Sequence, residues 1–388
     1  MKSAQTPHYI WQHPDWTRLY YDMNALAESL ANVRQSLGMV IGKAQAIGLT
    51  QTNLDDVSNS IWIEEAIATA AIEGQKLDVE QVRSSVMHKL GLADKGTSPR
   101  HVDGLIEVMF DATQQAHLEL TTDRLCRWQS ALFPGGTSGI QRIEVGKFRT
   151  FADPMQIISG RIGKEIVHYR APDSKIVAQE MAAFLAWFNA PVEQTQQSDS
   201  IIRAAIAHLW FETIHPFEDG NGRIGRAIID LALAQDKQLH ACGMARLASM
   251  SRTLQENRRA YYDALNSAQT GGLDITPWII WFLAQFFNAC QKTEQHITNA
   301  LQKAQFWSSH LDSNFNQRQR KTLQKLLDAG DDGFLGGMTA EKHSKITGAS
   351  KATATRDLTG LLAKDALISR GVGKATKYYI DVLGWNLG

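Results

Sequence analysis

The sequence predicts a mainly α protein with one small β-hairpin and a mixed helix-and-strand module near its C-terminal end. Apolar residues recur at helical spacing over long stretches, most clearly at residues 201–214 and 224–233. Short runs of glycine, proline and β-branched residues at 146–160 are instead typical of a hairpin among helices. Two short helical segments, 339–346 and 350–363, precede two strand-like runs and complete this outline.

Composition sets broad limits. With 388 residues, the chain is long enough for two or three domains and a sizeable core. Lys plus Arg and Asp plus Glu both number 40, so net charge identifies no partner. The three cysteines, Cys126, Cys242 and Cys290, form no C-x-x-C pair, so we expect neither a disulfide framework nor a zinc site, and a cytoplasmic location. The start of the chain has no secretory pattern, and the most apolar stretch, 275–289, is short and contains amides, so we expect no membrane span.

An early segment, residues 60–74, predicts a helix. Asn59 or Ser60 is the expected N-cap, and Gly74 is the expected terminator. Glu73 falls in the last turn of this helix, where the helix dipole disfavours an acid. A carboxylate at that place is expected to have a cationic partner, unless it simply ends the helix in solvent.

The densest functional run of the chain is residues 215–226, which lies between two predicted helices. It contains two glycines around an amide, followed by two arginines: Gly220, Asn221, Gly222, Arg223 and Arg226. The glycines permit a tight turn that presents backbone N–H groups at a helix N-terminus, which favours an anion. The arginines are three positions apart, so both can reach the anionic oxygens. Together these residues suit a polyphosphate.

Two other side chains of this run could take part in chemistry. Asp219 lies beside the turn and could hold Mg²⁺ against phosphates, because magnesium usually takes few protein ligands. His215 follows a helix and can be a neutral base near physiological pH. The alternative is that His215 only caps its helix and the run is a structural turn with surface arginines.

Residues 215–226 match the signature of the Fic (filamentation induced by cAMP) family, H-P-F-x-[DN]-G-N-G-R-x-x-R, at every fixed position. This resemblance implies a helical Fic core and transfer of AMP from ATP to a Ser, Thr or Tyr hydroxyl of a target protein or of the enzyme itself, with release of pyrophosphate. His215 would deprotonate the hydroxyl, and Asp219 would bind Mg²⁺. The glycine turn and Arg223 would hold the α- and β-phosphates, and Arg226 the γ-phosphate.

Residues 69–74, Thr-Ala-Ala-Ile-Glu-Gly, resemble the Fic inhibitory motif [ST]-x-x-x-E-[GN] in the class that carries it before the catalytic core. The resemblance implies that Glu73 pairs with Arg226 and denies it to the γ-phosphate, so Glu73→Gly is expected to raise activity. A homodimer could take part in relieving the inhibition, as in other family members. Removal of AMP by the same site, with Glu73 positioning water, stays open.

Residues 146–160 resemble the Fic flap, which pairs its backbone with an extended segment of the target. The pairing positions would be Met155, Gln156, Ile157 and Ile158. Residues 161–169 are extra relative to the expected spacing, so the clamping positions stay open, and an ordinary surface hairpin is the alternative. Three residues fall where the family lines its adenine pocket, although aromatic pairs in helices are more often core: Tyr261, Tyr262 and Gln269.

Four parts are expected in the chain. They are an N-terminal helical domain (1–92) that resembles an uncharacterised domain attached to many bacterial Fic proteins, a catalytic domain (93–292) that starts with a polar loop, a connecting helix (293–315) and a winged helix-turn-helix module (316–388). In the last part, a turn at Gly348 joins the two helices, and the strands are expected at 366–369 and 378–380, with glycines between them.

The C-terminal module could bind DNA. Between Glu341 and Lys377 there are eight Lys or Arg against three Asp or Glu, which suits a phosphate backbone. Four residues would face the groove: Lys351, Thr353, Thr355 and Arg356. Such modules also serve protein contacts. A DNA-binding regulator whose Fic-like core only senses a nucleotide therefore competes with the enzyme, although a sensor would not need His215 as a base.

Overall fold

The structure is a computed structural model that describes residues 8–46, 51–93, 98–151, 154–159, 166–191, 199–236, 250–330 and 333–385. It is mainly helical with small antiparallel strand pairs, which confirms the predicted fold class. The chain divides into two units, one of Met1–Gly42 and Asp56–Thr293 and the other of Lys43–Asp55 and Glu294–Gly388. Each unit is described by itself below.

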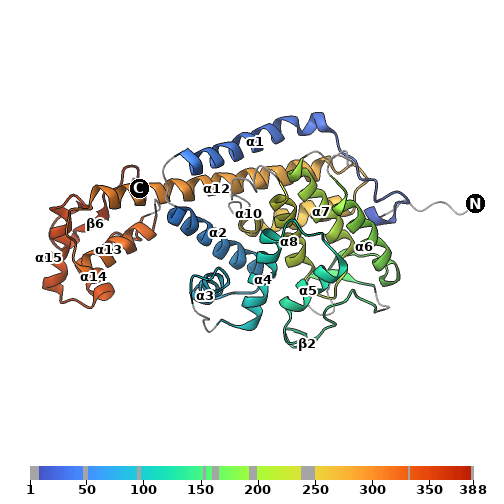
Figure 1. Ribbon diagram of the computed structural model, residues 1–388, viewed down its shortest axis with the longest axis horizontal. Helices are drawn as coiled ribbons and strands as arrows, with labels where there is room; N and C mark the ends of the chain where they lie inside the picture. The colour runs from blue at the N-terminus through green and yellow to red at the C-terminus, as the bar shows by residue number, and fades with distance from the viewer. Residues whose placement is uncertain are drawn as a thin grey trace, which may run out of the picture. The chain divides into compact units, whose positions relative to one another are not determined.

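Most helices precede the C-terminal module (Figure 1). From the N-terminus they are η1 (Ile10–Gln12), α1 (Met23–Ala46), α2 (Gln51–Ile72), α3 (Val79–Lys89), α4 (Arg100–Gln114), α5 (Thr122–Leu132), α6 (Ser174–Asn189), α7 (Ser200–Ile214), α8 (Asn221–Ala234), α10 (Met250–Glu256), α11 (Arg258–Gln269) and α12 (Thr276–Ser309). Helix α7 is the centre of the first unit, because every residue from Ile201 to Ile214 is buried. It packs against α6, α8 and α11, as expected of a helix that is apolar on all sides.

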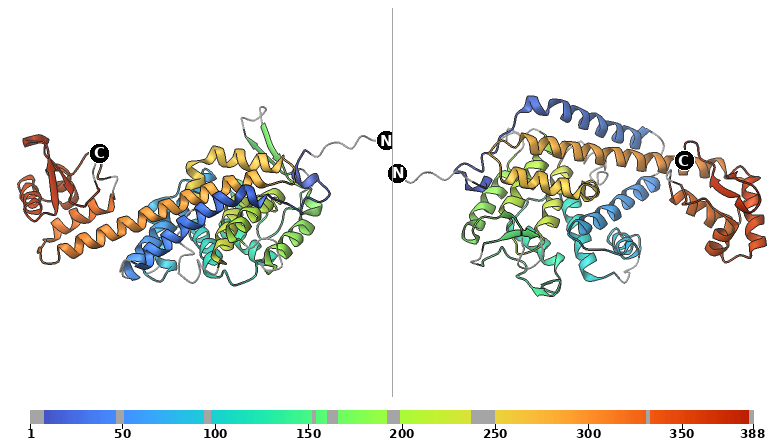
Figure 2. Two further views of the ribbon diagram at one scale, coloured as in Figure 1. Left: turned by 90° about the horizontal axis from the view of Figure 1, so that it is seen from above. Right: turned by 180° about the vertical axis from the view of Figure 1, so that it is seen from behind.

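In the described part of the first unit, β1 (Thr137–Ser138) pairs with β2 (Gln141–Arg142), and β3 (Gln156–Ser159) pairs with β4 (Ile166–Arg170). The prediction of a hairpin within 146–160 was wrong in its extent. Its second strand is β4, which lies in the stretch taken as extra residues, and residues 146–150 form no strand. Pairing between separated strands depends on register, which composition alone does not reveal. In the left view of Figure 2, the β3–β4 pair stands out from the helices.

Two helix predictions also need correction. Helix α2 begins at Gln51, so Asn59 and Ser60 lie inside it and do not cap it. Residues 51–60 contain neither glycine nor proline, and short polar side chains are tolerated within a helix when its other residues pack. The predicted connecting helix is the second half of α12, which runs unbroken to Ser309 because its only proline, Pro277, is in its first turn.

The second unit has the helices and strands predicted for the C-terminal module. They are α13 (Gln317–Asp328), α14 (Ala340–Thr347), α15 (Lys351–Leu362), β5 (Leu367–Arg370), η3 (Gly373–Ala375) and β6 (Lys377–Ile380). A left-handed Gly348, with φ of +73°, ends α14, and the Ser350 hydroxyl caps α15. Strand β6 pairs with β5 and forms a bridge from Tyr378 to Met338. Their apolar side chains share one core with α13 and α15.

Other expectations concern single residues or the membrane. Cys126 and Cys290 are free thiols, whereas Cys242 lies outside the described residues, as does most of the predicted loop at 93–99. None of the helices in the described part of the chain has the length and apolar character that a membrane span requires.

Candidate active site

His215 stands at the end of α7 in a strained conformation. Its φ of +53° places it in the left-handed region, and its N–H closes the helix by donating to the Phe211 carbonyl at 2.9 Å. Residues other than glycine rarely adopt this conformation, and it persists only where the surroundings enforce it. The His215 side chain is 12% exposed. The turn therefore presents the imidazole at the rim of a nearly closed site.

Arg149 is the residue that enforces this turn. Its Nε donates to the His215 carbonyl at 2.8 Å, and one terminal nitrogen donates to the carbonyls of Pro172 at 2.6 Å and Ile214 at 3.2 Å. Its backbone N–H donates to Pro216 at 2.8 Å. The guanidinium is fully buried, and this burial lowers its pKa to about 10, so it stays charged at neutral pH. Sequence reasoning gave Arg149 no role, since contacts 65 or more residues apart leave no local pattern.

The environment of His215 keeps its imidazole neutral. Burial, and then the charge of Arg149, lowers the pKa of His215 to about 4. One turn earlier on α7, the Glu212 carboxyl lies 3.7 Å from Nδ1, too far for a hydrogen bond. Burial raises the pKa of Glu212 to about 8, so this carboxyl is mostly protonated at neutral pH. The site therefore holds an unprotonated base. Glu212 was missed by sequence reasoning, and its i−3 spacing from His215 is the one local signal.

The turn after His215 opens helix α8. Gly220, with φ of +92°, is its N-cap. Asn221 is buried and uses its side-chain amide internally, accepting the Phe217 N–H at 2.9 Å and donating to the Phe217 carbonyl at 2.8 Å. Its side chain thus shapes the loop. The first N–H groups of α8 have no partners within the helix, and an anion at the turn would accept from them.

The arginines of α8 line the buried side of this turn. Arg223 is 6% exposed, stacks 4.7 Å from the centre of the Phe133 ring, and lies 3.8 Å from an Asp219 oxygen. Asp219 also accepts a hydrogen bond from the Ser138 hydroxyl, and its side chain is 40% exposed. Among the described residues, no three His, Cys, Asp or Glu side chains form a metal-binding cluster. Asp219 is therefore a single carboxylate that could share a cation with substrate phosphates.

Arg226 is bound by Thr69 in the last turn of α2 and by Glu73, which directly follows that helix. Glu73 Oε1 accepts a hydrogen bond from a terminal nitrogen of Arg226 at 2.7 Å. The Thr69 hydroxyl accepts a hydrogen bond from Arg226 Nε at 2.7 Å, and the Thr69 carbonyl accepts one from the same terminal nitrogen at 3.0 Å. Burial alone would raise the pKa of Glu73, but the charge of Arg226 and the hydrogen bond lower it below its ordinary value. Glu73 is thus an anion bound to the second arginine of the run.

Glu73 also lies directly against the glycine turn. A Cβ added to Gly222 would lie 2.3 Å from Glu73 Oε1 and 3.1 Å from an Arg226 nitrogen. The carboxylate therefore fills the space beside the first turn of α8. The structure thus brings the carboxylate of Glu73 to the place where the sequence predicts phosphate.

The expected flap strands are held by a contact with α7 and by pairing with each other. Tyr169 of β4 is buried, and its hydroxyl donates to the Thr213 carbonyl at 2.6 Å, which fixes the hairpin to α7. In β3, Gln156 and Ile157 pair with Arg170 and Tyr169, Ile158 pairs with Val167, and the Met155 carbonyl accepts the Ala171 N–H.

The expected adenine residues all lie on α11. Tyr261 is buried and its hydroxyl pairs with His208 Nε2 at 2.8 Å, whereas Tyr262 is 38% exposed. Gln269 is buried at the end of α11, on the same face as Tyr261. Tyr261 therefore belongs to the core, and Tyr262 is the member of the pair that is open to a ligand.

Comparison with known proteins places this site in a family. Residues 119–233 match the Fic/DOC family, and residues 9–92 match a domain of unknown function, DUF4172. A protein adenylyltransferase, fic-1, from Caenorhabditis briggsae is 27% identical over 220 residues, which cover 54% of this chain and 37% of that protein. A probable protein adenylyltransferase from Aquifex aeolicus is 35% identical over 77 residues, 20% of each chain. The chain therefore spans well under half the length of these relatives.

A solved structure agrees in fold. A Fic family protein from Desulfovibrio desulfuricans G20 superposes with a TM-score of 0.52 at 20% identity, covering 93% of this chain and 97% of that one. The matched residues 119–233 include the whole run 215–226, which forms the turn after α7 and the first turns of α8. Residues 119–233 therefore form a Fic/DOC domain, which contains this site.

Proposed function

We propose that this chain is an autoinhibited protein adenylyltransferase that transfers AMP from ATP to a Ser, Thr or Tyr hydroxyl. Relatives named protein adenylyltransferase support this reaction class. The observation that carries the inhibited state is the pair of Glu73 with Arg226, formed beside the glycine turn. The pair occupies a cation that the γ-phosphate of ATP would otherwise engage.

The proposed reaction needs one proton acceptor and a cradle for phosphates. His215 Nε2, the ring nitrogen away from Glu212, accepts the proton of the target hydroxyl, since the imidazole is unprotonated at neutral pH. The hydroxyl oxygen forms a bond to the α-phosphorus, and the bond from that phosphorus to the bridging oxygen of the β-phosphate breaks. Pyrophosphate leaves with the electron pair. The N–H groups that open α8, with Arg223, stabilise charge on the phosphates.

Mg²⁺ fits the residues present. A carboxylate that is 40% exposed at the edge of the turn, Asp219, would supply one ligand, and phosphates and water the others. Mg²⁺ bound there would neutralise charge on the phosphates during transfer. Ser138 and Arg223 orient the carboxylate toward the turn.

The experiment is AMP transfer from ATP labelled in its α-phosphate, with Mg²⁺, read as label on protein. The unmodified chain is compared with Glu73→Gly and with Glu73→Gly/His215→Ala. Glu64→Ala is the matched control, because it removes a carboxylate within α2 that also binds an arginine, Arg252. We expect label to rise in Glu73→Gly only and to disappear in the double variant.

Two results would contradict the proposal. Absence of label on the protein and on a cell lysate in all variants would exclude transfer under these conditions. An equal rise in Glu64→Ala would show that loosening α2 anywhere is sufficient, so that the contact of Glu73 with Arg226 is not the specific brake.

A further inference from the structure

The C-terminal unit presents one helix face that is free of acidic side chains. The exposed or partly exposed positions along α15 include two cations and otherwise small or hydroxyl residues: Lys351, Ala352, Thr355, Arg356 and Thr359. Thr353, which was predicted to face a groove, is half-buried and pairs with the Ser350 hydroxyl at the helix start. The opposite face of α15 packs into the core through Leu358 and Leu361.

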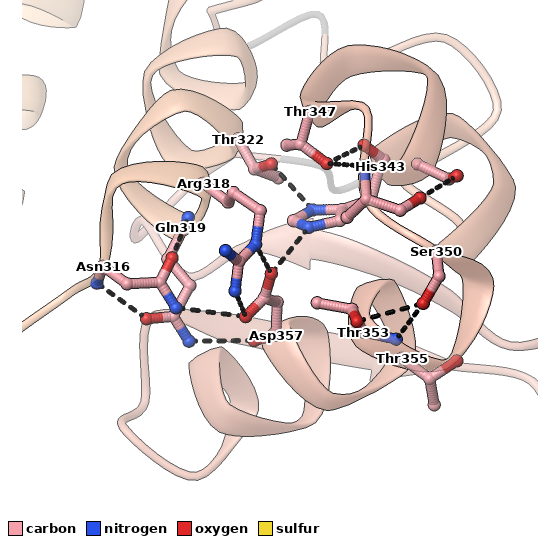
Figure 3. Close-up of polar contacts among 12 residues, drawn as sticks. Asn316, Arg318, Gln319, Thr322, His343, Thr347, Ser350, Thr353, Thr355 and Asp357 are labelled. Carbon is pink, nitrogen blue, oxygen red and sulfur yellow. Dashed lines mark hydrogen bonds and ion pairs between the residues drawn. The ribbon is translucent and has the colours of Figure 1, made fainter.

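The single acid of α15 is turned inward and neutralised. Asp357 is buried and accepts from Arg318 Nε at 2.7 Å, from the Asn316 amide at 3.1 Å, and contacts His343 Nε2 at 3.2 Å (Figure 3). Burial would raise the pKa of Asp357, but these partners lower it below its ordinary value. Thr322 contacts His343 from the other side at 2.8 Å. The network therefore fixes α15 against α13 and α14 and keeps the one carboxylate of α15 away from its exposed face.

The β5–β6 hairpin adds cations beyond the helix. Arg370 and Lys377 are register partners, and both are exposed. The turn between the strands is rich in glycine, and its Val372 is 90% exposed. On α14, exposed Glu341 is paired with Lys345 at 2.9 Å, so its charge is compensated. Residues 341–377 therefore carry a local excess of five positive charges in a chain whose net charge is zero.

We propose that the C-terminal unit binds duplex DNA, with the exposed face of α15 in the major groove and the β5–β6 hairpin against the phosphate backbone. Short side chains on a groove-facing helix permit close approach to base edges, and the flanking cations hold phosphates. The order of two helices joined by a tight turn, followed by an antiparallel strand pair, is that of winged helix-turn-helix modules. This inference does not depend on the AMP transfer proposed above.

DNA binding by the full chain is tested by the fluorescence anisotropy of a labelled DNA duplex of mixed sequence. If the four exposed cations Lys351, Arg356, Arg370 and Lys377 each contact a phosphate, the slope of log affinity against log salt is about −3 to −4. The Lys351→Ala/Arg356→Ala variant is expected to weaken binding roughly tenfold or more and to reduce the slope by about 2. The matched control is Lys321→Ala/Lys325→Ala, which removes two exposed lysines from α13.

The control and the unmodified chain are expected to bind alike, and circular dichroism checks that all variants fold. Three outcomes would overturn the proposal: no salt-dependent binding at low salt, an equal loss in the α13 control, or binding to single-stranded RNA alone. Failure of the first kind would point to a protein partner for this surface. AMP transfer by the same variants is expected to be unchanged.

Discussion

Arg149 offers the sharpest test of how the site works. Replacing Arg149 with Lys keeps the charge but loses the planar fork that reaches three carbonyls, those of His215, Ile214 and Pro172. An ammonium in the same place can satisfy one or two of them. Each buried carbonyl left without a donor costs about 1–3 kcal/mol, so the loss is about 1–6 kcal/mol in total. Part of this lost stability affects the left-handed turn that orients the His215 side chain.

A displaced base slows transfer. General bases contribute about 10²–10⁴ in rate, and a small misplacement can cost about 10². In a Glu73→Gly background, we therefore expect Arg149→Lys to lower the rate of AMP transfer by 10- to 100-fold. The matched control is Arg203→Lys. Arg203 is also buried, lies on α7, donates to the Phe188 carbonyl and to Gln235, and has a pKa that burial lowers to about 10.

The control separates stability from positioning. Arg203 lies about 18 Å along α7 from His215, at 1.5 Å per residue. Both variants are compared by thermal unfolding and by initial rate under saturating ATP. If Arg203→Lys loses as much activity as Arg149→Lys at a similar loss of stability, Arg149 is only a structural residue. An Arg149→Met variant adds a second readout, because removal of the charge should raise the pKa of His215 and so move the acid limb of the rate profile to higher pH.

Two further predictions concern pH. Because the pKa of His215 is lowered to about 4, the transfer rate of Glu73→Gly should stay flat from pH 7 down to about 5; a decline centred near 6.5 would contradict the buried base. Glu212 has a pKa raised from 4.5 to about 8, so the folded state holds a proton that the unfolded state releases, and stability falls as pH rises through this window, by up to about 1.4 kcal/mol per pH unit. Glu212→Gln should remove this slope in thermal unfolding measured from pH 5 to 8, and an unchanged slope would rule out Glu212 as its source.

Local features of the chain were predictable where local chemistry decides them. Helix α7 covers the predicted stretch 201–214 because Asp199 caps its start and its apolar residues are buried. The positive φ of Gly220 was likewise predictable, because a tight turn favours glycine at that position. Contacts across long sequence distances were different. The pairing of Glu73 with Arg226 spans 153 residues and was expected only from the resemblance to a family. The clamp of Arg149 and the position of β4 had no local signal, because tertiary pairing determines both.

The contacts around Arg226 explain why removing Glu73 should activate the site and leave it intact. Arg226 is held by three acceptors, and two of them belong to Thr69 and not to Glu73. In Glu73→Gly, Arg226 keeps its two hydrogen bonds to Thr69 and so stays oriented, while its other terminal nitrogen, which lies 3.1 Å from the position of a Cβ on Gly222, faces the glycine turn. In the proposed reaction, the γ-phosphate would then meet a preorganised donor, which binds at a lower entropic cost than a free side chain. Loss of Thr69 is a different change, since it would free Arg226 from α2 and leave the carboxylate in place.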